Sequence, residues 1–286
     1  MNAWTAYRSL SAEQKHIIRT KKIDLSRPID EILPLLKPLA ACDKLADKSR
    51  TKAGCSFGLG IVLSIVLLIV FSNIGWSAIT FPVFLLFIAA VVGAGVLWSF
   101  LRRVDISNNF RSFSLPVLTL MREDFDASKP VKLRMNLDPP TASSKKTAES
   151  APYKQGAYHK IIDTTYVDPW MTVSAVLVDG TKLSWDVTDE VRERKKTKRN
   201  ARGKYKTKTK YRKKTDIEVE MGLLKKTYSM TPSVDSALTS DAKRHKVSLE
   251  REVRTDSLDP IDPRVLIDVV ANVYRNTRQP VKEAGA

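Results

Sequence analysis

The sequence has few cysteines and histidines and lacks the short motifs of the common enzyme classes. Its two cysteines, Cys42 and Cys55, exclude a disulfide scaffold and suit a reducing compartment. The three histidines, His16, His159 and His245, lie in separate segments without the spacing of a zinc site. No glycine-rich phosphate loop, Gly-x-Ser-x-Gly or His-Glu-x-x-His occurs. We therefore predict a non-enzymatic protein with no catalytic residue, cofactor or metal.

Charge is absent from one long stretch. Ala53 to Leu101 are 49 consecutive residues without Asp, Glu, Lys, Arg or His. They form two apolar spans, about 54–74 and 77–101, and the turn residues between them include an interfacial Trp76. Because about 20 apolar residues cross the hydrocarbon core of a bilayer, the sequence predicts a transmembrane helical hairpin over 53–101. Two buried helices of a soluble protein are the alternative.

Basic residues beside the two spans predict the orientation. Cytoplasmic flanks of transmembrane helices carry an excess of Lys and Arg, and the loop between these spans has no charge. We expect an integral membrane protein, in the inner or plasma membrane if bacterial, with both termini cytoplasmic. No cleavable signal peptide is expected before the hairpin. The flanking residues are Lys44, Lys48, Arg50 and Lys52 before it and Arg102 and Arg103 after it.

Small residues recur at four-residue spacing within the hairpin. Gly54 and Gly58 form a GxxxG pattern in the first span, and Ala89 and Gly93 repeat the spacing in the second. Such residues let helix backbones approach closely. Packing within one hairpin and homo-oligomerisation through Gly54, Gly58 and Gly93 both explain the pattern, and an oligomerising pore or effector is one alternative function.

The first 52 residues read as a cytoplasmic segment of short helices. Ser11 to Gln14 has the spacing of a capping box, which predicts a helix start. A second helix begins near Pro28, and Pro34 and Pro38 are expected to kink or interrupt it.

Residues 102–286 predict a β-rich domain with an antiparallel sheet, so that the whole chain is an α+β membrane protein. A short helix is expected within 114–126, and apolar and polar residues alternate in strands at 131–137, 159–165, 171–178, 181–188 and 246–254. Residues 139–156 read as a loop. Asp179-Gly180 predicts a two-residue hairpin turn that places Val176 opposite Leu183. A helix at 262–277, capped by Asp262, is expected to cover one face of the sheet. Four aspartates are interpreted as turn or surface residues: Asp163, Asp168, Asp186 and Asp189.

One segment carries most of the positive charge. Fourteen Lys or Arg and one acidic residue lie between Arg192 and Lys214, a local charge of +13 out of a net +17. Lysine alternates with other residues from Lys204 to Arg212, which favours a strand over a solvated basic loop. A type I turn over 200–203 would close a long hairpin over 181–221 in which Arg192 faces Arg212.

This hairpin would place like charges directly opposite one another on one side. Such pairs are destabilising, so we expect an anionic partner. Tyr205 and Tyr211, on the reverse side, are candidate stacking residues. The expected anion-binding residues are Arg192, Arg194, Lys196, Lys198, Lys204, Lys206, Lys208, Lys210 and Arg212.

Acidic lipid is the expected partner, because the domain would be tethered beside the anionic cytoplasmic leaflet of a lipid bilayer. Nucleic acid is the alternative, since phosphates attract the same cations and tyrosines stack on bases. No recognised nucleic-acid-binding motif occurs in the sequence. An acidic protein or a second copy of the chain is a third candidate.

Overall fold

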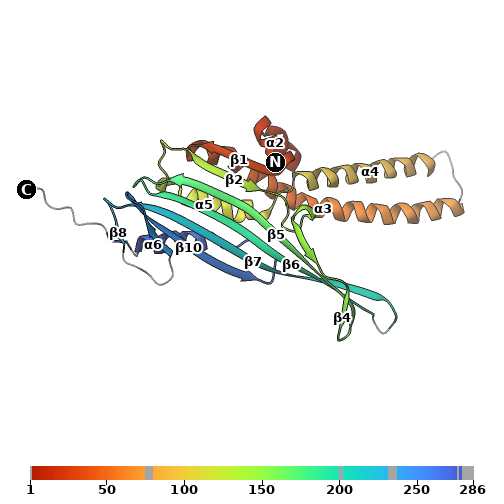
Figure 1. Cartoon of the computed structure of the whole chain (residues 1–286). Helices are drawn as coiled ribbons and strands as arrows, with labels where there is room; N and C mark the ends of the chain where they lie inside the picture. Colours follow the sequence, from red (N-terminus) through yellow and green to blue (C-terminus); the bar gives the residue numbers. More distant parts are fainter. Residues whose placement is uncertain (1, 75–79, 200–201, 231–236, 276, 279–286) are drawn as a thin grey trace, which may run out of the picture. The chain divides into compact units, whose positions relative to one another are not determined.

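The computed structural model describes residues 2–74, 80–199, 202–230, 237–275 and 277–278 (Figure 1). The chain forms two compact units. One consists of Met1–Thr20 and Leu35–Ile106 and is helical; the other consists of Lys21–Pro34 and Ser107–Ala286 and contains an antiparallel sheet.

Two short helices open the first unit, and side chains cap both of them. Asn2 accepts a hydrogen bond from the Thr5 amide (2.8 Å) at the start of α1 (Ala3–Ser9). At α2 (Ala12–Thr20) the Ser11 amide donates to the Gln14 side chain (2.8 Å), and the Gln14 amide donates back to Ser11 Oγ (3.2 Å). The predicted capping box is therefore confirmed.

The helix that follows corrects the prediction for the first 52 residues. α3 runs without interruption over Ile29–Ile74, through Pro34 and Pro38. Each proline removes a backbone hydrogen bond, at a cost of about 3 kcal/mol. The apolar face around them is buried, which offsets this cost, and the Leu35 carbonyl, one turn before Pro38, accepts a hydrogen bond from Gln14 Nε2 (2.9 Å). The expected interruption is therefore wrong, and the helix leads directly into the first apolar span.

Two helices are long and apolar enough to cross a membrane: the one over Ile29–Asn73 and α4 (Thr80–Val104). Their large aliphatic side chains are mostly exposed. Glycine lets the two backbones approach, because a Cβ added at Gly60 would lie 2.8 Å from Val91 Cγ2 and one at Gly95 would lie 2.8 Å from Phe57 Cε2. A Cβ at Gly58 or Gly93 would meet nothing within 4 Å. The predicted turn residue Trp76 lies outside the described residues.

Polar side chains join the two helices where charged residues resume. The Arg50 guanidinium of α3 contacts Asp105, just past the end of α4, and lies 3.5 Å from Asp47. Asp43 Oδ1 accepts a hydrogen bond from the Ile106 amide (3.0 Å). The three carboxylates, those of Asp43, Asp47 and Asp105, lie close enough together to hold a cation, but they already contact these protein groups.

The second unit is built on one antiparallel sheet with strand order β1-β2-β5-β6-β7-β10-β9 (Figure 1). Two further strands, β3 and β4, pair with β5. The bounds are β1 (Lys22–Arg27), β2 (Val131–Asn136), β3 (Lys146–Glu149), β4 (Tyr153–Gln155), β5 (Tyr158–Val176), β6 (Lys182–Arg199), β7 (Tyr205–Leu224), β9 (Ala237–Ser240) and β10 (Arg244–Thr255). A small separate pair joins β8 (Ser229–Met230) to β11 (Thr277–Arg278).

Three strand predictions need correction. β1 falls in a segment expected to be helical, and β3 and β4 fall in the expected loop at 139–156. The strands expected at 159–165 and 171–178 are one strand, β5, with a register shift between Pro169 and Met171. A bulge accommodates proline because the residue there needs no ladder hydrogen bond.

One face of the sheet holds the core. Leu183, Trp185 and Val187 of β6 are buried, as are their partners on the neighbouring strands. Helical segments cover this face: η1 (Phe110–Ser114), α5 (Leu115–Leu120) and η2 (Arg122–Asp124), followed by Phe125, whose ring stacks on Trp185 with centroids 6.5 Å apart. α6 (Arg264–Arg275) contacts α5, β7 and β10 through a buried apolar stripe.

The β5–β6 turn is one residue longer than predicted. The Gly180 amide donates to the Leu177 carbonyl (2.9 Å), and the Leu177 amide donates to the Thr181 carbonyl (2.8 Å). Gly180 has φ +80°. A type I turn followed by a left-handed glycine gives a three-residue loop instead of two. Val176 consequently pairs with Lys182, and the expected pairing with Leu183 is wrong.

We predict that Gly60→Leu disrupts the contact between α3 and α4, since its side chain would overlap Val91. The variant should unfold at a clearly lower temperature than the wild type in detergent. Gly58→Leu, two residues away in open space, is the matched control and should unfold at the wild-type temperature. Equal melting temperatures for the two variants would contradict the packing described here.

Candidate anion-binding surface

The pairing of β6 with β7 brings eight basic side chains together. Arg192 pairs with Arg212, Arg194 with Lys210, Lys196 with Lys208, and Lys198 with Lys206. Alternate residues of a strand share a face, so all eight lie on one side of the sheet, opposite to the core. We call this set the cationic face: Arg192, Arg194, Lys196, Lys198, Lys206, Lys208, Lys210 and Arg212.

The cationic face lies on what we call the arm, the part of the sheet that contains residues 192–199 of β6 and 205–212 of β7. The arm is wider than the two-stranded ribbon expected from the sequence. β5 continues beside β6, with Lys160 paired with Thr197, and β4 pairs with β5 in turn. On the other side, β10 pairs with β7 only from Lys213 onward. Within the described residues, the β7 edge between 206 and 212 has no strand partner. Lysine on an open edge opposes pairing with another strand.

Asp163 of β5 neutralises part of the cationic face. It accepts hydrogen bonds from Arg192 Nη2 (2.6 Å) and from Arg194 Nε and Nη2 (2.6 and 2.8 Å). These arginine contacts, together with one from Tyr153, hold the pKa of Asp163 well below its usual range although burial opposes this. The interpretation of Asp163 as a turn residue is wrong, because it lies within β5, on the solvent-facing side of the sheet, with its side chain 11% exposed. The sequence alone did not pair β5 with β6 here.

The cations nearest the tip are more open. Lys198, Lys206, Lys208 and Lys210 are exposed. A groove of about 610 Å³ lies farther from the tip, shares Lys210 with this set, and is lined by both signs of charge. Its basic walls come from the cationic face, and the opposite wall comes from residues after β10, where Asp256 lies 3.6 Å from Arg212. The lining residues are Arg192, Arg194, Lys196, Thr209, Lys210, Tyr211, Arg212, Asp256, Ser257 and Leu258.

The predicted stacking residues lie on the reverse side of the arm and differ from each other. Tyr211 is partly buried and donates its hydroxyl hydrogen bond to Glu193 Oε1 (3.2 Å). Tyr205 is 67% exposed, and its ring lies 4.9 Å from that of His159. Lys204 is exposed just before β7 begins. The structure therefore does not bring the two tyrosines onto the cationic face.

On the core face, the base of the arm contains a buried polar layer. Asp168 (2% exposed) and Asp189 (1% exposed) pair across β5 and β6, so their interpretation as turn or surface residues is also wrong. Lys145 donates to Asp168 Oδ2 (2.8 Å) and to the Asp138 carbonyl (2.8 Å). Burial raises the pKa of Asp168 to about 6, against the effect of Lys145.

Asp189 is held by three partners. It accepts hydrogen bonds from Thr215 Oγ1 (2.5 Å) and Asn109 Nδ2 (3.0 Å), and Lys213 Nζ lies 3.9 Å away. Burial lowers the pKa of Lys213, and the Asp189 carboxylate opposes this change. Through Asn109, which directly precedes η1, this layer connects the strands to the helical segment.

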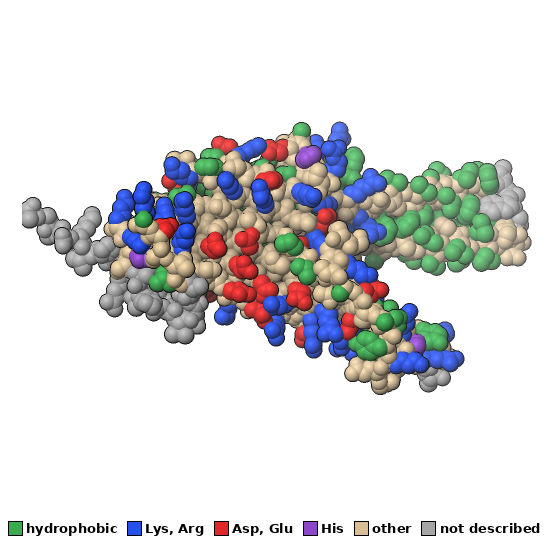
Figure 2. Space-filling view, in the orientation of Figure 1, with side chains coloured by type: hydrophobic (Ala, Val, Ile, Leu, Met, Phe, Trp, Pro, Cys, Tyr) green, Lys and Arg blue, Asp and Glu red, His purple; other side chains and the backbone are tan. Residues whose placement is uncertain are grey.

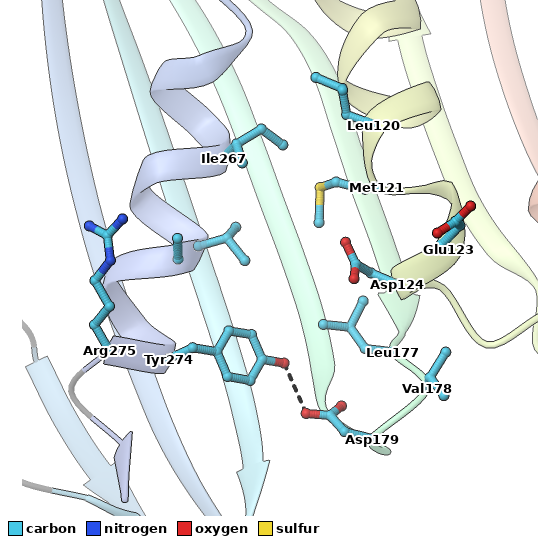
Figure 3. A pocket seen from close by; sticks show the side chains of 12 residues that line it. Leu120, Met121, Glu123, Asp124, Leu177, Val178, Asp179, Ile267, Tyr274 and Arg275 are labelled. Carbon is cyan, nitrogen blue, oxygen red and sulfur yellow. Dashed lines mark hydrogen bonds between the residues drawn. The ribbon is translucent and has the colours of Figure 1, made fainter.

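The residues of Figure 3 line a second cavity, of about 970 Å³, in the same unit. Its walls come from α6, from 120–124 and from the β5–β6 turn. Tyr274 donates to Asp179 Oδ2 (3.0 Å), as does Tyr228 (2.7 Å). Burial raises the pKa of Asp179, but hydrogen bonds from Thr181 and the tyrosines outweigh it and lower that pKa overall. Sequence reasoning missed this cavity because it joins segments about 50 to 150 residues apart.

We predict that Asp189→Ala lowers the free energy of unfolding by about 3–5 kcal/mol, because it leaves Asn109 and Thr215 without their acceptor and removes the negative charge beside the buried Lys213. Asp186→Ala, on the exposed face of the same strand, should change it by about 0.5 kcal/mol or less. Urea unfolding followed by tryptophan fluorescence measures both. Equal losses would show that the buried layer does not stabilise the sheet.

No protein-family model, curated protein or solved structure matches this chain. Its function is therefore inferred from the chemistry of its own surfaces.

Proposed function

We propose that the chain is a two-pass integral membrane protein whose β domain binds an anionic surface, acidic lipid of the cytoplasmic leaflet, through the cationic face. The protein acts as a binding protein rather than as an enzyme. The single observation that carries the proposal is the set of four directly opposed like-charge pairs between β6 and β7.

The exposed aliphatic side chains of the two long helices support membrane insertion. Soluble monomers rarely expose apolar patches larger than a few hundred Å², because contact of such patches with water is unfavourable. Here the residues exposed by about half or more include Leu59, Val62, Leu86, Val92 and Val96. A hydrocarbon environment removes this cost. The basic flanks, including Arg50, Arg102 and Arg103, then favour a cytoplasmic position for both termini.

Electrostatics supports an anionic partner for the arm. Eight cations on one face repel one another, and Asp163 compensates for two of them. Each Lys or Arg near an anionic leaflet contributes about 1 kcal/mol, and this attraction decays over about 8 Å at physiological salt. A membrane anchor keeps the domain close to such a leaflet, which favours lipid over a soluble polyanion.

The positions of the tyrosines favour lipid over nucleic acid. Single-stranded nucleic acid is bound by cations that contact phosphates together with aromatic rings that stack on bases. Here Tyr205 lies on the reverse side from the cationic face, and Tyr211, which lines the groove beside Arg212, has its hydroxyl hydrogen-bonded to Glu193. Lipid headgroups need only the cations.

We predict that replacing Lys206, Lys208 and Lys210 by Gln weakens binding to anionic vesicles about 100-fold, from about 1 kcal/mol per charge. The full chain, held in nanodiscs of neutral lipid, is floated with acidic or neutral vesicles over a salt series. The matched control replaces Lys129, Lys225 and Lys226, three exposed lysines away from the arm, by Gln. Binding that is lost equally in both triple variants would reflect net charge alone and contradict the proposal.

A second variant should strengthen vesicle binding in the same measurement. Asp163→Asn removes the carboxylate that neutralises Arg192 and Arg194, so binding should tighten about fivefold. Nucleic acid added as a competitor should leave most of the vesicle binding intact. If it removes the protein from the vesicles, the partner is a polynucleotide.

A further inference from the structure

The solvent-facing side of the sheet separates its charges along the strands. The cationic face occupies the arm half of β6 and β7, and acidic side chains occupy the other half, which Figure 2 shows as a red cluster beside blue ones. On β7 the sign changes between Lys214 and Asp216, and on β6 it changes between Glu190 and Arg192. Both halves lie on the face opposite to the core.

Three acidic residues form a row across neighbouring strands. Asp186 pairs with Glu218, and Glu218 pairs with Glu250. All three are exposed. We call Asp186, Glu218 and Glu250 the acidic row. Like charges directly opposite one another are destabilising in a sheet, so the acidic row repeats, with reversed sign, the repulsion within the cationic face.

The two sets have complementary spacing. The pair of Asp186 and Glu218 lies eight residues from the pair of Arg194 and Lys210 along each strand, a separation of about 26 Å at 3.3 Å per residue. The pair of Glu190 and Lys214 lies midway between the acidic pair and the basic pair. A two-fold axis that runs across the strands along this middle pair exchanges the acidic and the basic half. Two sheets related by this axis would therefore oppose Asp186 to Arg194 and Glu218 to Lys210 on each side of the axis.

We propose that two copies of this chain dock face to face through this surface, with the exposed Asp186, Glu218 and Glu220 of each copy against Arg194, Lys210 and Lys208 of the other. The contact is isologous and closed, since the same surface is used by both copies. Pairing through the β7 edge is opposed by its lysines, which leaves the faces for association. The proposal depends on charge and register and not on lipid binding, although the dimer covers the cations that would bind lipid.

The test measures the mass of the full chain in detergent by light scattering after size exclusion. The wild type should be a dimer at 50 mM salt and a monomer at 500 mM, because screening shortens the range of the attraction. A wild type that is monomeric at 50 mM would overturn the proposal. So would a dimer that persists at high salt in every variant, since this would indicate association through the apolar helices.

Two charge-reversed variants distinguish loss of the dimer contact from loss of the fold. One variant combines Asp186→Lys, Glu218→Lys and Glu220→Lys; the other combines Arg194→Glu, Lys210→Glu and Lys208→Glu, the three residues that the axis places opposite them. Each variant alone should be monomeric at 50 mM salt. Their equimolar mixture should form a one-to-one heterodimer. The control, with Lys129, Lys225 and Lys226 replaced by Glu, should stay dimeric.

A monomeric mixture, or variants that dimerise alone, would overturn the proposal. Vesicle binding by a chain that never dimerises would overturn it while leaving the proposed function standing.

Discussion

The hydrogen-bonded ladder between β6 and β7 determines which face of the sheet each charged residue of these two strands occupies. Because side chains alternate across a strand, one register places Trp185 and Val187 in the core and Asp186, Glu190 and Arg192 in solvent. A shift by one residue would exchange the two sets. Burial of the apolar set therefore fixes the positions of the charged set, including charges that repel one another.

That repulsion is tolerated at a cost, which the structure reduces in different ways on the two faces. On the core face, buried charges are paired, as Lys145 is with Asp168. On the outer face, Asp163 neutralises two arginines, while the lysines toward the tip and the acidic row stay exposed to water. An exposed surface of like charge is a natural place for a partner of opposite sign, and both proposals made above follow from this arrangement.

Sequence patterns predicted the two long apolar helices and the antiparallel sheet domain, because uninterrupted hydrophobicity and strict alternation are local signals. They failed where tertiary contacts decide. Packing carries α3 through Pro34 and Pro38, and a bulge joins two expected strands into β5. The cations of the arm could be named from the alternation of Lys residues. Asp163 and the buried pair of Asp168 and Asp189 could not, because their roles depend on β5 pairing with β6.

Spin labels on the two sides of the arm test the central claim most directly. In full-length protein with Cys55→Ser, which leaves the buried Cys42, one label replaces Lys208 on the cationic face and another replaces Thr207 on the reverse side. With anionic vesicles, the label at 208 should become immobilised and shielded from a water-soluble relaxation agent, while the label at 207 stays mobile and accessible. Equal responses at the two positions, or none at either, would contradict recognition through the cationic face.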